Sequence, residues 1–271
     1  ARSQMAALRI HEEAIRRKWA LRVIGVPKAI DNGLPYTDHC PGYGSALKYN
    51  AATVIEVATD LAGAGAGEGV CCIVEVVGRD SGWVAAGTVV ARGTSEGAPH
   101  VVLLPEIPFE EKAFLEKVSA IASARGSCVV VAAEGLKDLE GKELGAHPTL
   151  RDVTDRPLLS GVGENLAQMV QERLGLAASS LKPGCAQRAA AHCASATDLA
   201  EALACGETAV RAAVEGKGGM MVKIVRTQND PYESEVLLED LQQVVKAVQT
   251  VPREWISEDG FLPNESFTAY V

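Results

Sequence analysis

Apolar runs of strand length alternate with longer amphipathic stretches along most of the chain. The strand-like runs are nearly uninterrupted, as in "VCCIVEVVG" over residues 70–78. Continuous apolar runs of this length are typical of parallel strands that are covered on both faces of a sheet. The pattern therefore predicts an α/β protein with mostly parallel sheets and helices on both faces.

The boundaries of the elements follow from where the apolar period changes. Residues 136–160 are polar and carry Gly, Pro and Asp, so they are expected to form a surface excursion. The predicted strands cover 21–26, 70–78, 100–106, 128–135 and 220–226. The predicted helices cover 4–19, 45–62, 82–91, 109–124, 161–175, 195–215 and 233–248.

The composition narrows the classes of partner. The formal net charge is −9, and Lys and Arg are scattered along the chain. Nucleic acid and anionic membrane are therefore not expected as partners, whereas a phosphorylated small molecule needs only a few cations in one pocket. The apolar runs are about strand length, so neither a membrane span nor a signal peptide is predicted.

The cysteine pattern predicts reduced thiols rather than disulfides or a metal site. None of the seven cysteines forms a Cys-x-x-Cys pair, and the histidines have no matching spacing for zinc. Cys71, Cys72 and Cys128 lie within apolar strand-like runs. We therefore expect core thiols in a cytoplasmic protein, and we predict no metal ligands in this chain.

Polar side chains follow four of the predicted strands. Ligands of open α/β sheets bind at the carboxyl ends of the strands, so these groups are expected to surround one cleft if the strands are parallel. A plainer interpretation is open for each, namely turn residues, a surface ion pair or a neighbour of a helix cap. The residues are Lys28, Asp31 and Asn32, then Arg79 and Asp80, then Glu106, and last Glu134.

Five ordered motifs resemble those of the 6-phosphofructokinases. "GVPKAIDNGLPYTDHCPGYGSALKY" resembles the family segment Pro-Lys-Thr-Ile-Asp-Asn-Asp with its following Thr-Asp and Pro-Gly-Phe/Tyr-Gly, and "EVVGRDSGWVAAG" resembles Glu-Val-Met-Gly-Arg with its Gly-Trp. "LLPEIPF", "VVVAAEG" and "PGCAQRAAAHCASATDLAEA" follow in the family's order and at about its spacing. The resemblance covers nearly the whole chain and is closest to the branch that includes pyrophosphate-using enzymes.

The resemblance implies a glycolytic phosphotransferase. Its reaction moves a phosphoryl group from pyrophosphate or ATP to the 1-hydroxyl of fructose 6-phosphate with Mg²⁺, which is chemistry of positioning and charge neutralisation. By the match, Asp31 is the base that accepts the hydroxyl proton, and Arg79 stabilises charge on the transferring group. Glu134 would accept hydrogen bonds from sugar hydroxyls, and Arg188 would bind the 6-phosphate.

The remaining implied binding residues include three departures from the family pattern. Lys28 would reach the phosphates of the donor, and Gly78 would let the backbone approach the sugar. Ala29 stands where the family has Thr, Val77 where it has Met, and Cys185 where it has His or Tyr. Gly33 likewise replaces an Asp, and these changes are expected to weaken the site.

The resemblance also implies an architecture. It predicts two α/β lobes: residues 1–43 plus 187–232 belong to the phosphoryl-donor lobe, 44–186 form the sugar-phosphate lobe, and 233–271 form a C-terminal helical segment. A homodimer or homotetramer is expected. The chain opens with "ARSQMAALRI", without an initiator Met, where the family's Gly-Gly-Asp loop ends. We therefore expect an N-terminally truncated chain whose donor is undetermined, since the residue that decides the donor lies in that loop.

Two other functions stay open. Ala29, Gly33 and Cys185 fit a non-catalytic phosphofructokinase-like subunit that regulates or binds a partner. A different α/β kinase or nucleotide-binding regulator would need a Gly-rich nucleotide loop, and the sequence contains no Gly-x-x-x-x-Gly-Lys-Ser/Thr motif. The second alternative is therefore the weaker one.

Overall fold

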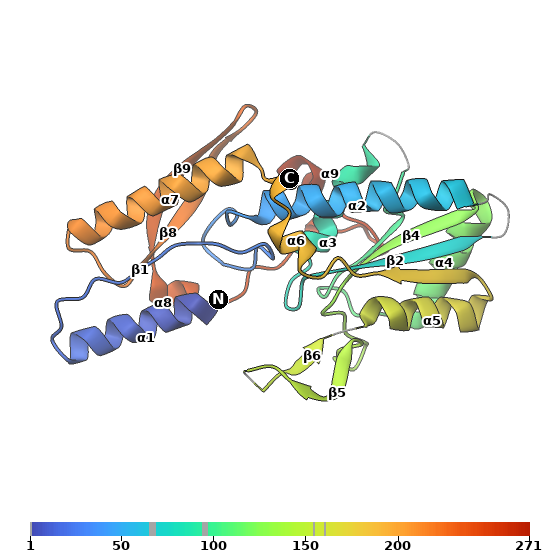
Figure 1. Cartoon of the computed structure of the whole chain (residues 1–271), viewed down its shortest axis with the longest axis horizontal. Coiled ribbons are helices and arrows are strands. Elements are labelled where there is room, and N and C mark those ends of the chain that lie inside the picture. The colour runs from blue at the N-terminus through green and yellow to red at the C-terminus, as the bar shows by residue number, and fades with distance from the viewer. Residues whose placement is uncertain (1, 65–68, 94–96, 154, 160) are drawn as a thin grey trace. The chain divides into compact units, whose positions relative to one another are not determined.

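The chain forms two compact units, each with its own sheet. The computed structural model describes residues 2–64, 69–93, 97–153, 155–159 and 161–271 (Figure 1). Unit 1 comprises Ala1–Ser45 and His192–Gln249, and unit 2 comprises Ala46–Ala191 and Thr250–Val271. None of the helices in these ranges is both long and apolar enough to span a bilayer.

Unit 2 contains a parallel four-stranded sheet in the order β3-β4-β2-β7. Its strands are β2 (Val70–Val76), β3 (Val101–Leu103), β4 (Ser127–Ala133) and β7 (Ala177–Leu181). β2, β3 and β4 are almost wholly buried, which confirms the expected parallel α/β arrangement. The pattern analysis missed β7 because "AASSL" is a mostly exposed strand at the edge of the sheet and lacks a long apolar run.

Helices cover both faces of this sheet. α4 (Glu111–Arg125) and α5 (Val162–Leu174) bury Phe114 and Leu166 against the strand residues Ile73 and Val130. α2 (Tyr43–Ala64) lies on the face opposite α5 (Figure 1). The predicted helices at these positions are therefore confirmed to within a few residues.

Shorter elements complete unit 2. α3 (Trp83–Gly87) continues into the 3-10 helix η1 (Thr88–Arg92), and α6 (Ala186–Ala189) follows β7. The predicted surface excursion contains an antiparallel pair, β5 (Ala146–Arg151) and β6 (Pro157–Leu159). In the C-terminal tail, η3 (Arg253–Trp255) and α9 (Glu265–Tyr270) contribute Trp255, Phe267 and Tyr270 to an aromatic cluster around Trp83.

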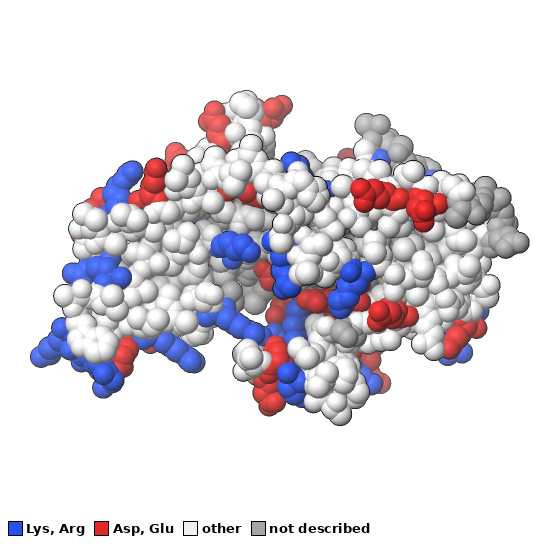
Figure 2. All heavy atoms as spheres, viewed as in Figure 1, with Lys and Arg blue, Asp and Glu red and all other residues white. Residues whose placement is uncertain are grey.

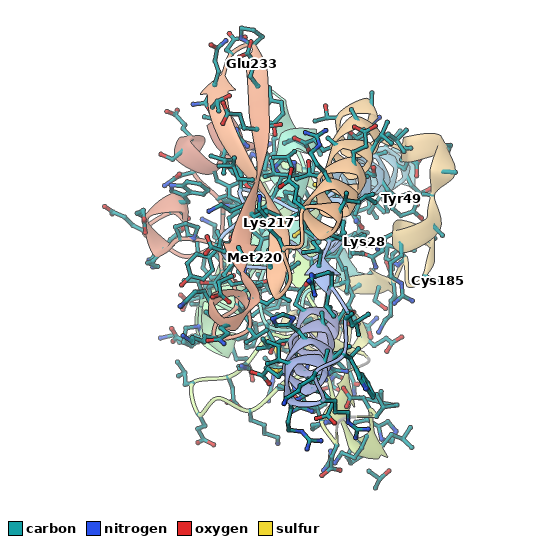
Figure 3. The ribbon with its side chains drawn as sticks, turned by 90° about the vertical axis from the view of Figure 1, so that its left-hand side faces the viewer. Lys28, Tyr49, Cys185, Lys217, Met220 and Glu233 are labelled. Carbon is teal, nitrogen blue, oxygen red and sulfur yellow. The ribbon has the colours of Figure 1, made fainter. Side chains whose placement is uncertain are left out.

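Unit 1 contains a mixed sheet in the order β1-β8-β9. β1 (Ile24–Gly25) pairs in parallel with β8 (Met220–Asn229), which pairs in antiparallel fashion with β9 (Tyr232–Asp240). Figure 3 labels Met220 where β8 begins and Glu233 near the far tip of the hairpin. The helices of this unit are α1 (Arg2–Arg16), α7 (Ala196–Val214) and α8 (Leu241–Val244), and the 3-10 helix η2 (Ala191–Cys193) precedes α7.

The prediction of a helix over 233–248 is wrong. The sequence "YESEVLLED" is a strand whose side chains alternate between half-buried and exposed over most of its length, and only 241–244 are helical. Glu and Leu are good helix formers, but pairing with β8 overrides that local preference. The predicted strand 21–26 is also shorter, because only Ile24 and Gly25 are described in register with β8.

Basic and acidic side chains are spread over the visible surface, with one local group of basic residues (Figure 2). On the face shown in Figure 2, basic side chains gather over α1, and elsewhere both signs are interspersed. Arg16 and Arg17 at the end of α1 both pair with Glu13.

Candidate functional site

In unit 1, the donor loop, which comprises residues 26–42 and carries Lys28 and Asp31, leaves β1 at Gly25, which packs closely against α1. A Cβ on Gly25 would lie 2.0 Å from Oε1 of Gln4, a buried side chain of α1. Gln4 also donates from Nε2 to the carbonyl oxygen of Val26 at 3.0 Å. The start of the loop is therefore held directly against α1.

Further along, the loop is hydrogen-bonded to itself and to β8. Asn32 is fully buried with a φ of 51°, and its Oδ1 accepts a hydrogen bond from the backbone N–H of Cys40 at 2.9 Å. The Thr37 hydroxyl accepts from the N–H of Ile224 at 2.9 Å, and the N–H of Asp38 donates to the Ile224 carbonyl at 2.8 Å. The plainer interpretation of Asn32 as a turn residue is confirmed.

These contacts place the predicted donor-side residues. Lys28 and Asp31 are exposed, and the side chain of Lys28 lies over Gly42, whose φ of +106° favours glycine (Figure 3). Ala29 packs against the buried cluster that contains Leu8 and Leu34. The methyl group that replaces the family's Thr thus contributes to the core of unit 1.

A buried charge network anchors the end of this loop, and sequence reasoning missed it. His39 is hydrogen-bonded through Nδ1 to Asp38 at 2.8 Å and through Nε2 to Glu201 on α7 at 2.6 Å. Arg226 on β8 donates to Asp38 at 3.1 Å, and the Tyr232 hydroxyl donates to Glu201 at 2.6 Å. The loop is therefore joined to α7, β8 and β9 by charged hydrogen bonds, which are stronger than neutral ones.

The network keeps His39 protonated near neutral pH. Burial alone would lower the pKa of His39, but the hydrogen bonds and charges of Asp38 and Glu201 outweigh it and raise the pKa to about 9. Burial likewise opposes ionisation of both carboxyls, but the bonds from His39 and from Arg226 or Tyr232 lower their pKa values. An imidazolium thus links two carboxylates.

This arrangement predicts a loss of stability in alkali. The pKa of His39 is raised on folding from 6.5 to about 9, so its contribution is complete below pH 6.5 and is lost as the pH rises through 9. At 1.36 kcal/mol per unit, the free energy of unfolding is expected to fall by as much as roughly 3 kcal/mol. Urea unfolding between pH 6 and pH 9.5 measures the change. The variant His39→Gln is expected to show a flatter profile, and equal slopes for the two proteins would contradict the assignment.

In unit 2, two glycines let the ends of β2 and β4 approach closely. Gly78 has a φ of +150°, and a Cβ there would lie 2.6 Å from the Ser81 carbonyl oxygen. A Cβ on Gly135 would lie 1.9 Å from the carbonyl oxygen of Arg79. The N–H of Gly135 donates to the Gly78 carbonyl at 3.1 Å. The backbone at Gly78 and Arg79 is thereby held against Gly135, the residue that follows Glu134.

The charged residues after β2 pair with the excursion and not with each other. Arg79 pairs with Glu143 at 3.1 Å, and Asp80 pairs with Arg156 at 2.6 Å. The interpretation of Arg79 and Asp80 as one surface ion pair is therefore wrong. Arg79 is also mostly buried, with 16% of its side chain exposed.

Glu134 lies half-buried at the end of β4. Burial raises the pKa of its carboxyl, an effect that its hydrogen bond with Gly78 and the charges of Lys182 and Arg79 partly offset. Nearby, the buried Glu75 accepts a hydrogen bond from the N–H of Gly163 in the first turn of α5 and pairs with Lys182. Glu75 lies within the quoted motif but was not among the predicted site residues.

A buried glutamine joins the two segments that carry the predicted sugar-phosphate residues. Gln187 accepts a hydrogen bond at Oε1 from the N–H of Val77 at 3.3 Å and donates from Nε2 to the Gly184 carbonyl at 3.1 Å. Cys185 precedes α6 and is exposed (Figure 3). Arg188 lies within α6 and is also exposed. The structure therefore brings the Val77–Arg79 and Cys185–Arg188 segments together.

Glu106 is a structural residue. Its Oε1 accepts hydrogen bonds from the N–H groups of Gly82 and Val251, each at 2.9 Å, and burial raises the pKa of its carboxyl. The four strand ends belong to two sheets, because β1 lies in the sheet of unit 1 and β2, β3 and β4 in that of unit 2, so the expectation of one shared cleft stays a prediction.

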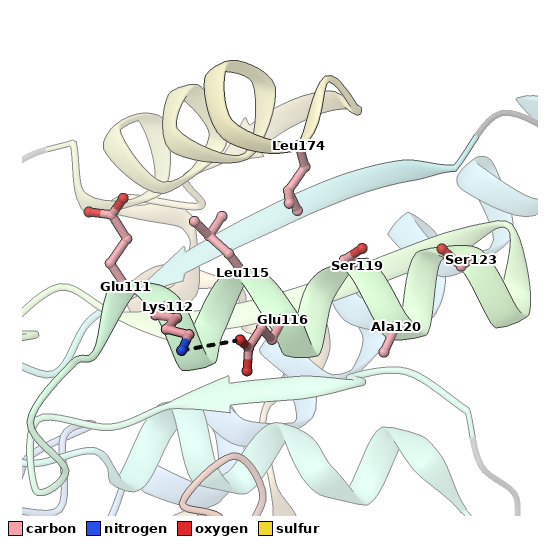
Figure 4. Close-up of a pocket in the computed structure, with 8 residues that line it drawn as sticks. All are labelled: Glu111, Lys112, Leu115, Glu116, Ser119, Ala120, Ser123 and Leu174. Carbon is pink, nitrogen blue, oxygen red and sulfur yellow. Dashed lines mark ion pairs between the residues drawn. The ribbon is translucent and has the colours of Figure 1, made fainter.

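A surface depression outside the predicted site residues and the grouping of possible metal ligands complete the description of unit 2 and of the chain. A surface depression of about 610 Å³ lies over α4 and the end of α5, lined in part by Leu115, Leu174 and the ion pair Lys112–Glu116 (Figure 4). Within the described parts of the chain, no three or more His, Cys, Asp or Glu side chains are grouped to hold a metal ion. We therefore assign no Mg²⁺ ligands to these residues.

Comparisons with known proteins agree on one family. The phosphofructokinase family model matches residues 2–213. The pyrophosphate–fructose 6-phosphate 1-phosphotransferase of Xanthomonas campestris is 38% identical over 255 residues, which cover 94% of this chain and 61% of that protein. The enzyme of the same name from Methylococcus capsulatus is 35% identical, with coverages of 97% and 63%. The chain thus spans about three fifths of the length of these relatives.

Solved structures of related proteins share the fold. The pyrophosphate-dependent phosphofructokinase from Nitrosospira multiformis matches with a TM-score of 0.88 and 35% identity, over 99% of this chain and 64% of that one. The one from Marinobacter aquaeolei matches with a TM-score of 0.86 and 36% identity, with the same coverages. From its sequence motifs and its fold alike, this chain belongs to the phosphofructokinase family.

Proposed function

We propose that this chain carries the sugar-phosphate site and part of the donor site of a phosphotransferase that phosphorylates fructose 6-phosphate at its 1-hydroxyl. The observation that carries the proposal is the buried Gln187, which joins the Val77–Arg79 segment to the Cys185–Arg188 segment. These segments are more than a hundred residues apart in sequence, and the predicted sugar-phosphate residues lie on them and on the adjoining end of β4.

In unit 2, the proposed roles follow from chemistry and position. Arg188 is an exposed guanidinium suited to bind the 6-phosphate with two hydrogen bonds. Glu134 accepts hydrogen bonds from sugar hydroxyls, and the backbone at Val77 and Gly78 approaches the sugar. Arg79 stabilises the negative charge of the transferring phosphoryl group.

In unit 1, Asp31 is the proposed general base and Lys28 the cation for the donor phosphates. Asp31 is exposed and lies next to Asn32, whose side chain makes the buried hydrogen bond of the turn, so the backbone that carries the proposed base is held in place. The relatives named for use of pyrophosphate support that donor over ATP. Mg²⁺ would enter with the donor phosphates and neutralise part of their charge. We also propose that the protein is a homo-oligomer in the cytoplasm. The cysteines of the core are free thiols, which supports a reducing compartment.

A non-catalytic subunit is the second candidate. Ala29 favours it, because a partly buried methyl group packed against the core replaces a hydroxyl beside the base. This candidate predicts binding of fructose 6-phosphate without turnover, so binding and turnover must be measured separately.

Binding of the sugar phosphate is the direct test of the unit 2 assignments. Calorimetry with the 271-residue chain is expected to detect fructose 6-phosphate, and Arg188→Ala is expected to weaken its binding roughly 10- to 100-fold because charged hydrogen bonds are lost. Lys112→Ala, an exposed basic residue on α4, is the matched control and should leave the affinity unchanged. Equal weakening by both variants would contradict the role of Arg188.

A further inference from the structure

Arg79 is held along one edge of its guanidinium by a residue that neither the motifs nor the proposed roles include. Its Nε donates to Glu143 Oε1 at 3.2 Å and its Nη2 donates to Glu143 Oε2 at 3.1 Å. The two side chains are 16% and 14% exposed. A two-bond contact of this kind fixes the plane of the guanidinium, and partial burial protects it from competition by water.

The geometry leaves part of the guanidinium for another anion. Arginine has five N–H donors, and Glu143 uses one on Nε and one on Nη2. Asp152 makes a longer ion pair with the same guanidinium, with its Oδ2 3.6 Å from Nη1. Beyond these two carboxylates, Nη1 and Nη2 still carry N–H groups that can donate to an oxyanion while the Nε edge is held.

Glu143 is itself fixed to the body of unit 2. The next residue, Leu144, donates its N–H to the Leu136 carbonyl at 2.9 Å, just beyond the end of β4. A Cβ on Gly145 would lie 2.8 Å from the Val162 side chain at the start of α5, so the chain passes close to that helix. The segment that the sequence predicts only as a surface excursion thus contains an anchored carboxylate.

The same segment also holds the neighbour of Arg79. Arg156 donates to both carboxylate oxygens of Asp80, at 2.9 and 2.6 Å, and lies 3.8 Å from Glu143. The hydrogen bonds from Arg156 also lower the pKa of the Asp80 carboxyl. Both charged residues of the "GRD" motif are therefore oriented by residues from 143–156.

We propose that Glu143 is a positioning residue for phosphoryl transfer, which acts by holding the Nε edge of Arg79 so that its Nη edge meets the transferring group. This inference rests on the proposed function of Arg79. It assigns a role to the excursion between β4 and α5, namely that it orients the arginine that stabilises the transition state.

The test compares Glu143→Ala and Glu143→Gln with Glu140→Ala, an exposed acid on the same segment. In the turnover assay, Glu143→Ala is expected to lower kcat roughly 100-fold with little change in the KM for fructose 6-phosphate, because a misplaced group loses rate more than binding. Glu143→Gln keeps one acceptor and the side-chain volume, and should fall between. An unchanged or increased kcat in Glu143→Ala would overturn the proposal.

A second readout does not need turnover. The rate at which phenylglyoxal modifies Arg79, followed by peptide mass mapping of the intact 271-residue chain, is expected to rise several-fold in Glu143→Ala and to stay at the wild-type value in Glu140→Ala. If the wild-type chain turns over with neither donor, the proposed function fails, and the modification rate still decides whether Glu143 holds Arg79. An unchanged rate in Glu143→Ala would overturn the inference.

Discussion

Replacing Asp31 with asparagine is expected to lower turnover by roughly 10²- to 10⁴-fold, the usual contribution of a general base. Asparagine has nearly the same shape but cannot accept the proton of the sugar hydroxyl. The loop should keep its conformation, because its buried hydrogen bonds are made by Asn32 and Thr37. Formation of fructose 1,6-bisphosphate measures the effect, and calorimetry should show that fructose 6-phosphate still binds.

The matched control for this change is Asp60→Asn. Asp60 is exposed on α2, and the substitution likewise replaces a carboxylate by an amide. It should leave kcat unchanged. If Asp31→Asn retained most of the wild-type kcat, the general base would have to be another residue.

The largest effect on stability is expected from Glu201→Ala. Glu201 is 6% exposed and accepts hydrogen bonds from His39, Tyr232 and Ser234, so its removal leaves a buried imidazolium with one fewer carboxylate and leaves two hydroxyls without this acceptor. Breaking a buried ion pair by removing one partner costs about 3–5 kcal/mol. Urea unfolding at pH 7 should show a loss of this size.

Glu207→Ala tests whether that loss comes from the network. Glu207 lies on the same helix but is exposed, so its replacement should change the free energy of unfolding by less than about 0.5 kcal/mol. Similar losses in the two variants would show that the charge network contributes little. The expected difference would show that the donor loop is held in place by α7.

Part of the fold could be predicted because the central strands of the unit 2 sheet are buried on both faces. Continuous apolar runs identify β2 and β4 without knowledge of their neighbours. β9 could not be identified in this way, because its preference for strand comes from pairing with β8 and not from its own composition. β7 was missed for a similar reason, since it is short and mostly exposed.

The candidate site shows the same division. Lys28, Asp31 and Arg79 could be found because the motifs are contiguous in sequence. The contacts between segments could not be found, because Glu143 lies 64 residues from Arg79 and Gln187 lies 110 residues from Val77. Glu106 illustrates the opposite error. It was predicted as a ligand-binding residue at a strand end, but its carboxylate accepts hydrogen bonds from two backbone N–H groups.

The most direct test of this account is turnover by the 271-residue chain. The chain is mixed with fructose 6-phosphate and Mg²⁺, pyrophosphate and ATP are supplied separately, and fructose 1,6-bisphosphate is followed. Slow formation with pyrophosphate is expected, because Ala29, Gly33 and Cys185 weaken the site, and Asp31→Asn should abolish most of it. Binding of fructose 6-phosphate without product from either donor would contradict the catalytic proposal and favour the non-catalytic subunit.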